Sequence, residues 1–290
     1  MKVLVTGAQG QLGTDVVTAL EEAGETPVGV TRADADLTDH SALRALVRDE
    51  SPDAVVNCAA FHDVAECEER PDVAFAVNAK AVQVLAESCA SIDASLMTVS
   101  TDYVFDGTRA GGYTEDDTPN PLNVYGESKL QGEHRAAAAH SDVFVVRTQS
   151  LFGLSRPTGK GSNFVELVLG LALERDELRV DQFRMAPTST ATLAANMVAL
   201  LRSDAFGLYH MSCEGETTWF EFARRIVELE GLDVDVVAVP NDYYKTTFAR
   251  PENTYLVNAA LRNAGLDLMP SWEDALETYL GTRPAVRGAS

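Results

Sequence analysis

The feature that most constrains the fold is a regular alternation of short apolar runs with helical patterns in the first 150 residues. Five apolar runs are strand candidates, at residues 2–5, 27–30, 54–57, 96–100 and 143–147. Between them, apolar residues recur at helical spacing at 12–23, 41–50, 72–91 and 124–139. Strands that alternate with helices form a parallel sheet covered on both faces, and continuous apolar strands are typical of such burial. We therefore expect a Rossmann-type, doubly wound α/β domain at residues 1–150.

The alternation is looser after residue 150. Helices are expected at 163–175, 190–202, 218–230 and 271–280, and strands at 177–180 and 207–211. Trp219 and Phe220, at the start of one of these helices, are expected in the core. The pattern predicts a smaller C-terminal α/β substrate-binding region over 151–290, parts of which, at about 181–202, can return to the Rossmann domain.

The charge balance excludes several classes of partner. The 290 residues include 44 acidic and 23 basic side chains, for a net charge of −21, and only 5 of the basic residues are lysine. Such a chain is repelled by nucleic acid and by anionic membranes, and no apolar run approaches the roughly 18 residues of a membrane span. We expect a soluble, cytoplasmic protein without a metal site. An acid excess with scarce lysine is typical of salt-adapted proteins, and an ordinary acidic enzyme is the alternative.

Glycines connect the first expected strand to the first helix. Gly7, Gly10 and Gly13 allow a tight turn and a close approach of the backbone to a pyrophosphate, and Gln11 and Leu12 begin the helix. The N–H groups and dipole of a helix N-terminus attract phosphate. This context, between a strand and a helix, predicts a dinucleotide site.

The end of the second expected strand bears on the choice of cofactor. An acidic residue there would hold the ribose hydroxyls of NAD, but the strand ends in Thr31 and Arg32. Arginine can pair with a 2′-phosphate, which favours NADP(H). Asp34 or Asp36 could reach back to the ribose, so NAD(H) stays open as the alternative.

Tyr125 and Lys129 lie four residues apart on an expected helix and therefore share one face. A neighbouring ammonium is expected to lower the pKa of the phenol and prepare it for proton transfer. Thr101 ends the preceding strand, at the edge where open α/β sheets bind ligands. These residues predict one catalytic cluster over the cofactor.

Two segments carry a family resemblance, at residues 100–107 (STDYVFDG) and 121–133 (PLNVYGESKLQGE). Shorter agreements lie at 57–61, 146–148, 161–164, 181–188 and 207–210. The sequence resembles the dTDP-4-dehydrorhamnose reductase family of extended short-chain dehydrogenase/reductases. The resemblance implies hydride transfer from NAD(P)H to the C4 ketone of a nucleotide-linked 6-deoxy sugar, in precursor synthesis for polysaccharides or glycans.

The resemblance also implies roles for individual residues. Tyr125 would protonate the developing alkoxide, Lys129 would bind the nicotinamide ribose, and Thr101 would hydrogen-bond the reacting oxygen. Besides the glycine turn, Thr31 and Arg32, the expected cofactor-binding residues are Asp36, Leu37, Ala59, Ala60, Phe61, His62 and Ser100. The expected substrate-binding residues are Thr101, Asp102, Ser150, Asn163 and Arg184. A homodimer is one option for the assembly.

The chain departs from the family pattern after Arg147 and Thr148, where Gln149, Ser150 and Leu151 replace a segment that often carries a sugar-contacting aromatic residue. Two alternative functions stay open. A nucleotide-sugar epimerase or dehydratase would use the same cluster, although a dehydratase needs a second carboxylate where Tyr103 stands. A non-catalytic subunit like the regulator of methionine adenosyltransferase would bind cofactor without turnover.

Salt adaptation predicts that the melting temperature rises as KCl increases to about 1 M, because the Debye length then falls to roughly 3 Å and self-repulsion is screened. Thermal unfolding across a KCl series checks this, with a sucrose series as the control for general solvent exclusion. A melting temperature that does not respond to KCl would indicate an ordinary acidic enzyme.

Overall fold

The central layer of the computed structural model, which describes residues 1–155 and 162–283, is a six-stranded sheet in the order β10-β5-β4-β3-β1-β2. All of its strand pairs are parallel. The strands are β1 (Lys2–Thr6), β2 (Thr26–Val30), β3 (Ala54–Asn57), β4 (Ser95–Thr101), β5 (Val143–Thr148) and β10 (Gly207–His210). Every residue of β3 and β5 is buried, as the continuous apolar runs predict. The predicted doubly wound fold is confirmed.

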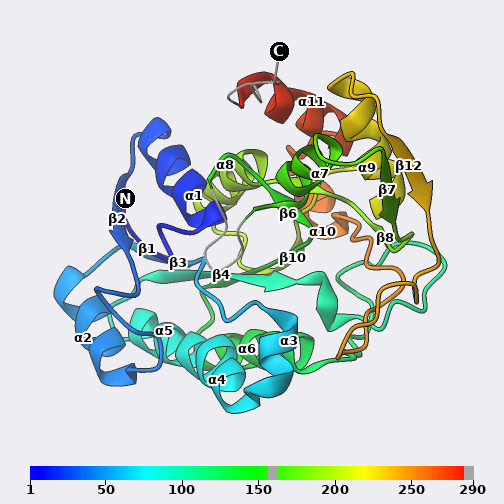
Figure 1. Ribbon diagram of the computed structural model, residues 1–290. Helices are drawn as coiled ribbons and strands as arrows, with labels where there is room; N and C mark the ends of the chain where they lie inside the picture. The colour runs from blue at the N-terminus through cyan, green and yellow to red at the C-terminus, as the bar shows by residue number, and fades with distance from the viewer. Residues whose placement is uncertain (156–161, 284–290) are drawn as a thin grey trace.

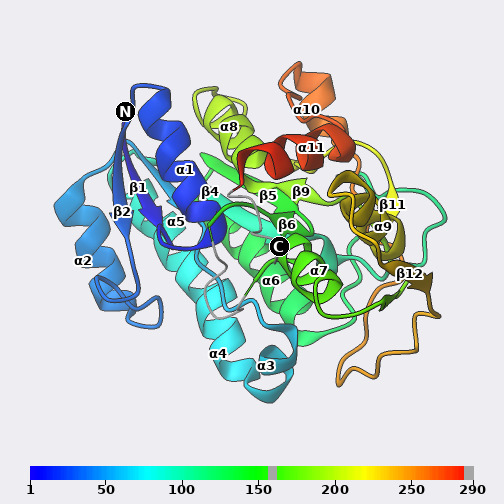
Figure 2. The same cartoon turned by 45° about the horizontal axis from the view of Figure 1, so that its top comes forward.

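Helices cover both faces of the sheet (Figure 1). On one face lie α2 (His40–Glu50), α5 (Ala81–Ala90) and α6 (Val124–Ala139). On the other, α1 (Gln11–Glu22) packs beside α8 (Thr190–Leu201), as Figure 2 shows. The sixth strand, β10, and the helix α8 that precedes it both come from residues beyond 150. The main sheet is therefore completed by the second half of the chain.

The segment expected as one helix over 72–91 is interrupted. It consists of α4 (Pro71–Phe75), a π-helical turn η1 (Ala76–Lys80) and α5, and it follows a short helix, α3 (Val64–Glu69). The π turn buries Asn78, a polar residue, between helices. Such turns are rare and often lie at functional sites.

The rest of the second half forms a smaller layer of helices and short strands. Its elements are β6 (Leu151–Phe152), α7 (Phe164–Ala172), β7 (Glu177–Val180), β8 (Arg184–Met185), β9 (Thr188–Ser189), β11 (Thr217–Thr218), α9 (Trp219–Leu229), β12 (Asp235–Ala238), α10 (Ala259–Ala264) and α11 (Trp272–Thr282). Residues 156–161 and 284–290, which belong to the expected substrate-binding region, lie outside the described residues. Among the residues described, no helix is long and apolar enough to cross a membrane.

A buried ion pair and one further hydrogen bond link β4, β5 and α6. Arg147 on β5 is 3% exposed and donates two hydrogen bonds to Glu133 on α6, from Nε to Oε1 at 3.0 Å and from Nη2 to Oε2 at 2.6 Å. The hydroxyl of Ser100 on β4 donates to the same carboxylate. A buried charge is tolerated only when it is paired and hydrogen-bonded, and both conditions hold here.

Arg147→Met would leave Glu133 buried without its cation. We expect the free energy of unfolding to fall by about 3–5 kcal/mol, the typical cost of removing one partner of a buried pair. Urea denaturation at constant KCl measures this. Arg44→Met, which removes an exposed ion pair with Glu87, is the matched control and should have little effect. An equal loss of unfolding free energy in the two variants would show that the buried pair stabilises the fold no more than the exposed pair does.

Candidate active site

The predicted catalytic residues meet at the carboxyl ends of β4 and β5. Thr101 is the last residue of β4, and Thr148, the last residue of β5, is its register partner. Tyr125 and Lys129 lie on α6, which packs against β4. Asn123 caps the N-terminus of α6, because its side chain accepts a hydrogen bond from the Gly126 N–H at 2.9 Å. This cap fixes the first turn, which carries Tyr125.

The phenol of Tyr125 lies close to the Thr101 hydroxyl, which acts on its pKa. Burial raises the pKa of the Tyr125 phenol, and the Thr101 hydroxyl opposes that shift only in part. The expectation that Lys129 lowers this pKa is therefore wrong for this structure, because desolvation dominates. A phenol with a raised pKa remains protonated at neutral pH, so it can act as a proton donor.

Lys129 is buried, and its Nζ donates to the carbonyl of Val99 on β4 at 2.6 Å. Burial lowers the pKa of the ammonium to about 8, while the negative charge of Glu133, one helical turn further on, opposes the shift. The ammonium is thus held against the strand that ends in Thr101.

Asp102 adds a buried carboxyl group next to Thr101. The Thr101 hydroxyl donates to Asp102 Oδ1 at 2.9 Å. Burial raises the pKa of Asp102 to about 6, and hydrogen bonds from Thr254 and Thr101 oppose the shift. Asp102 therefore changes its charge close to neutral pH, next to the predicted proton donor.

The glycine turn fits the phosphates of a dinucleotide. Gly7 has φ +68°, and a Cβ on Gly13 would lie only 2.1 Å from the Gly7 carbonyl, so α1 can approach β1 this closely only with glycine. The α1 helix begins after Gly10 without a side-chain cap or an acidic residue in its first turn. The amide Nε2 of Gln11 is buried without a hydrogen-bond partner among the described residues. These free donors at a helix N-terminus match an anionic ligand.

The loop after β3 carries Ala59, Ala60, Phe61 and His62, four of the expected cofactor-binding residues. Asn78 fixes this loop, because its Oδ1 accepts from the Phe61 N–H at 2.9 Å and its Nδ2 donates to the Phe61 carbonyl at 2.8 Å. The same amide contacts Ser128 Oγ on α6 at 3.0 Å.

Asn78 and Glu133 support the site, and the sequence did not single them out. Asn78 reads as one polar residue in a helical pattern, and Glu133 as a carboxylate on a polar helix. Neither pattern reveals burial or a distant partner. Ser100, which is expected to line the cofactor, donates its hydroxyl to Glu133.

The segment after β2 exposes Arg32, whose side chain is 88% accessible. Its guanidinium lies 3.4 Å from Asp36, and Asp36 also accepts hydrogen bonds from Thr38, which lower its pKa. Asp34 accepts from the N–H and hydroxyl of Thr31. Asp34 and Asp36, the two carboxylates that could hold a ribose, are thus hydrogen-bonded within their own segment. The Arg32 side chain is exposed to solvent, and Leu37 is half-buried.

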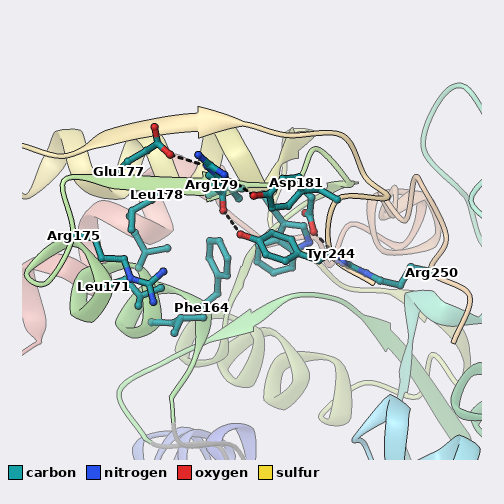
Figure 3. A pocket seen from close by; sticks show the side chains of 14 residues that line it. Phe164, Leu171, Arg175, Glu177, Leu178, Arg179, Asp181, Tyr244 and Arg250 are labelled. Atoms are coloured by element: carbon teal, nitrogen blue, oxygen red, sulfur yellow. Dashed lines mark hydrogen bonds and ion pairs between the residues drawn. The ribbon is translucent and has the colours of Figure 1, made fainter. Parts of the chain in front are cut away.

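A cavity of about 630 Å³ opens in the second half of the chain, between α7, β7, the start of α9 and the segment around residues 243–250 (Figure 3). Aromatic residues and arginines share its lining: Phe164, Trp219, Tyr243, Tyr244, Arg175, Arg179 and Arg250. Trp219, expected in the core, is half-buried and lines this cavity as well as packing on Phe164 at 4.4 Å between ring centroids.

Arg250 connects the cavity to the catalytic cluster. It pairs with Asp181 at 3.0 Å, and its positive charge lies close enough to the phenol of Tyr103 to act on the pKa of that group. The Tyr103 ring packs edge-on against Tyr125, with 5.9 Å between centroids. A ligand in the cavity could therefore extend toward Tyr125.

The remaining expected substrate-binding residues are placed as follows. Asn163 caps α7 and donates its amide to Gly153 and Tyr279. Arg184 pairs with Glu216 and donates to the Ala110 carbonyl at 2.9 Å, outside the cavity lining. Ser150 follows β5 in a left-handed conformation with φ +48°.

Comparisons with known proteins agree with this geometry. A family model described as RmlD substrate binding domain matches residues 1–283. The spore coat polysaccharide biosynthesis protein SpsK of Bacillus subtilis is 37% identical over 284 residues, which cover 97% of this chain and 98% of the relative. A dTDP-4-dehydrorhamnose reductase of Burkholderia thailandensis is 38% identical over 296 residues, with 95% and 97% covered.

Solved structures give the same result. A dTDP-4-dehydrorhamnose reductase of Clostridium acetobutylicum has a TM-score of 0.92 at 33% identity, covering 97% of this chain and 99% of that one. The Bacillus anthracis reductase, in complex with NADP, has a TM-score of 0.91 at 34% identity, with 96% and 98% covered. A UDP-glucose 4-epimerase of Thermotoga maritima, at 17% identity and a TM-score of 0.84, shows the fold alone.

The Rossmann fold and the full-length reductase relatives show an NAD(P)-dependent oxidoreductase of the extended short-chain dehydrogenase/reductase class. The predicted family resemblance is confirmed by matches over nearly the whole chain. This chain belongs to the dTDP-4-dehydrorhamnose reductase family.

If Arg32 binds a 2′-phosphate, Arg32→Ala should weaken NADPH binding by about tenfold or more and spare NADH, because a hydrogen bond to a charged group is lost for one cofactor only. Fluorescence titration with both cofactors measures this. Arg48→Ala, which removes another exposed arginine, paired with Asp49, is the control. An equal loss for NADPH and NADH would contradict the assignment.

Proposed function

We propose that this protein reduces the C4 ketone of a nucleotide-activated 4-keto-6-deoxy sugar, with NADP(H) as the preferred cofactor. The observation that carries the proposal is the cluster of Thr101 and Tyr125 at the carboxyl end of β4, beside a buried Lys129 whose Nζ donates to the Val99 carbonyl. The names of the full-length relatives and the NADP complex of the Bacillus anthracis reductase support it.

The residues divide the reaction between them. NADPH, when bound at the glycine turn, supplies a hydride to C4 of the sugar. Tyr125 donates its phenolic proton to the C4 oxygen as the alkoxide develops, and the raised pKa keeps that proton in place beforehand. Thr101 positions the same oxygen. Lys129 holds its positive charge close to the strand end, where it stabilises the phenolate that remains, and water then returns a proton to Tyr125.

We assign the nucleotide of the substrate to the cavity lined by Trp219 and Tyr244. Aromatic faces suit a nucleobase, and guanidinium groups suit a pyrophosphate. Arg175 lines the cavity and forms no ion pair within the described residues. Arg250 lies between this cavity and Tyr103, so the sugar would extend past it toward Tyr125.

The product would serve the synthesis of polysaccharide or glycan precursors in the cytoplasm. The relative SpsK, named for spore coat polysaccharide biosynthesis, supports that context. The exposed Arg32 supports the preference for NADP(H) over NAD(H). A homodimer remains our proposal for the assembly.

The first test is to incubate the protein, in high salt, with NADPH and a dTDP-4-keto-6-deoxy sugar and to follow the nicotinamide absorbance. We expect sugar-dependent oxidation of NADPH. Tyr125→Phe should lower turnover by about 10²-fold or more without weakening cofactor binding. Tyr209→Phe, which removes a hydroxyl on β10 that donates to the Ala205 carbonyl, is the control and should retain activity.

Other outcomes have distinct meanings. Full turnover by Tyr125→Phe would exclude Tyr125 as the proton donor. Tight NADPH binding without oxidation would contradict the reductase and favour an epimerase or a cofactor-binding regulatory subunit.

A further inference from the structure

Two polar side chains at the end of β5 are buried without use in the mechanism above. Thr148 ends the strand and Gln149 follows it, and Gln149 is only 2% exposed. Within the described residues, neither Thr148 Oγ1 nor Gln149 Nε2 has a hydrogen-bond partner. Buried polar atoms are nearly always paired in native proteins, so unpaired ones next to an active site are candidates for contact with a ligand.

The position of Gln149 points to the reacting end of the substrate. Thr148 pairs in register with Thr101 on the neighbouring parallel strand, and Gln149 and Asp102 are the residues that follow each. Adjacent strands lie about 4.8 Å apart, so Asp102 and Gln149 are neighbours just past the strand ends, and the hydrogen bond from the Thr101 hydroxyl to Asp102 Oδ1 at 2.9 Å places Asp102 beside the hydroxyl assigned to the C4 oxygen.

The amide of Gln149 is oriented by its surroundings. The Thr254 hydroxyl lies 3.4 Å from Gln149 Oε1, and it shares its one proton between this oxygen, the Arg184 carbonyl at 3.3 Å and Asp102. The carbonyl of the next residue, Ser150, accepts from the Thr188 N–H at 3.1 Å, which fixes the left-handed turn that follows. With its oxygen facing Thr254, the amide leaves Nε2 as its free donor.

The chemistry of the proposed substrate gives that donor a target. In a 4-keto-6-deoxyhexose, the carbonyl at C4 lies between C5, which bears a methyl group, and C3, which bears a hydroxyl. The polar side chains of Gln149 and Asp102 beside the C4 site suit the C3 side, which bears a hydroxyl, better than the C5 side, which bears a methyl group. There, Gln149 Nε2 can donate a hydrogen bond to the hydroxyl oxygen, and the Asp102 carboxylate can accept the hydroxyl proton.

We propose that Gln149 determines specificity by hydrogen-bonding the C3 hydroxyl of the sugar, with Thr254 positioning the amide. The proposal rests on the proposed function and adds to it the requirement for a hydroxyl next to the reacting ketone. Sites that hydrogen-bond a substrate hydroxyl reject the analogue without it, because the buried groups of the protein are then left unpaired.

The experiment compares three substrates in the wild type and in Gln149→Met, which keeps the side-chain length and removes the amide. The substrates are the complete dTDP-4-keto-6-deoxy sugar, its 3-deoxy analogue and its 2-deoxy analogue. We expect the wild type to lose about tenfold or more in kcat/KM with the 3-deoxy analogue and little with the 2-deoxy analogue. In Gln149→Met, kcat/KM with the complete substrate should fall to the value that the wild type has with the 3-deoxy analogue. The kcat/KM with the 3-deoxy analogue should change little between the wild type and the variant.

Gln131→Met is the matched control, because Gln131 lies on α6 and bonds only Arg135 among the contacts found for its side chain in the described part of the chain; it should keep the wild-type preference. A uniform loss on all three substrates in Gln149→Met would indicate a structural role and overturn the proposal. A wild type that does not distinguish the 3-deoxy analogue would overturn it without any variant. A wild type that turns over none of the substrates would instead refute the proposed function, and this inference with it.

Discussion

The buried ion pair between Glu133 and Arg147 holds together the elements on which the site depends. It joins α6, which carries Tyr125, to β5, and through Ser100 to β4, which ends in Thr101. Because a buried carboxylate is stable only with its partners in place, the pair specifies how α6 lies on the sheet. The distance between the phenol and the strand-end hydroxyl follows from that arrangement.

The second constraint is the close approach of α1 to β1 at the glycine turn, where the cofactor is expected to bind. The absence of a side chain at Gly13 lets α1 lie against β1, which brings the N-terminal N–H groups to the edge where β4 and β5 also end. Asn78 fixes the loop around Phe61 in a similar way, because its side-chain amide hydrogen-bonds both the N–H and the carbonyl of Phe61. The backbone is thus held in place at two separate segments, the glycine turn and the Phe61 loop, that flank the expected cofactor position.

Much of the fold and the catalytic cluster could be predicted because their signals are local. The apolar run at 54–57 predicted β3 with the bounds that the structure shows, and the helical spacing at 124–139 did the same for α6. The π turn at Asn78, the buried state of Glu133 and the strands that form the cavity depend on contacts between distant segments, which periodicity does not contain. The pKa of Tyr125 was predicted in the wrong direction for the same reason: the pairing with Lys129 is visible in the sequence, but the extent of burial is not.

The place of β10 in the sheet has a consequence for how the protein is made. During synthesis, β5 leaves the ribosome well before β10 does, so one edge of a largely apolar sheet stays open while the intervening residues are added. Unpaired edges of this kind invite association with other chains. The high negative charge of the chain opposes such encounters, so the acidic composition can protect the nascent protein as well as the folded one.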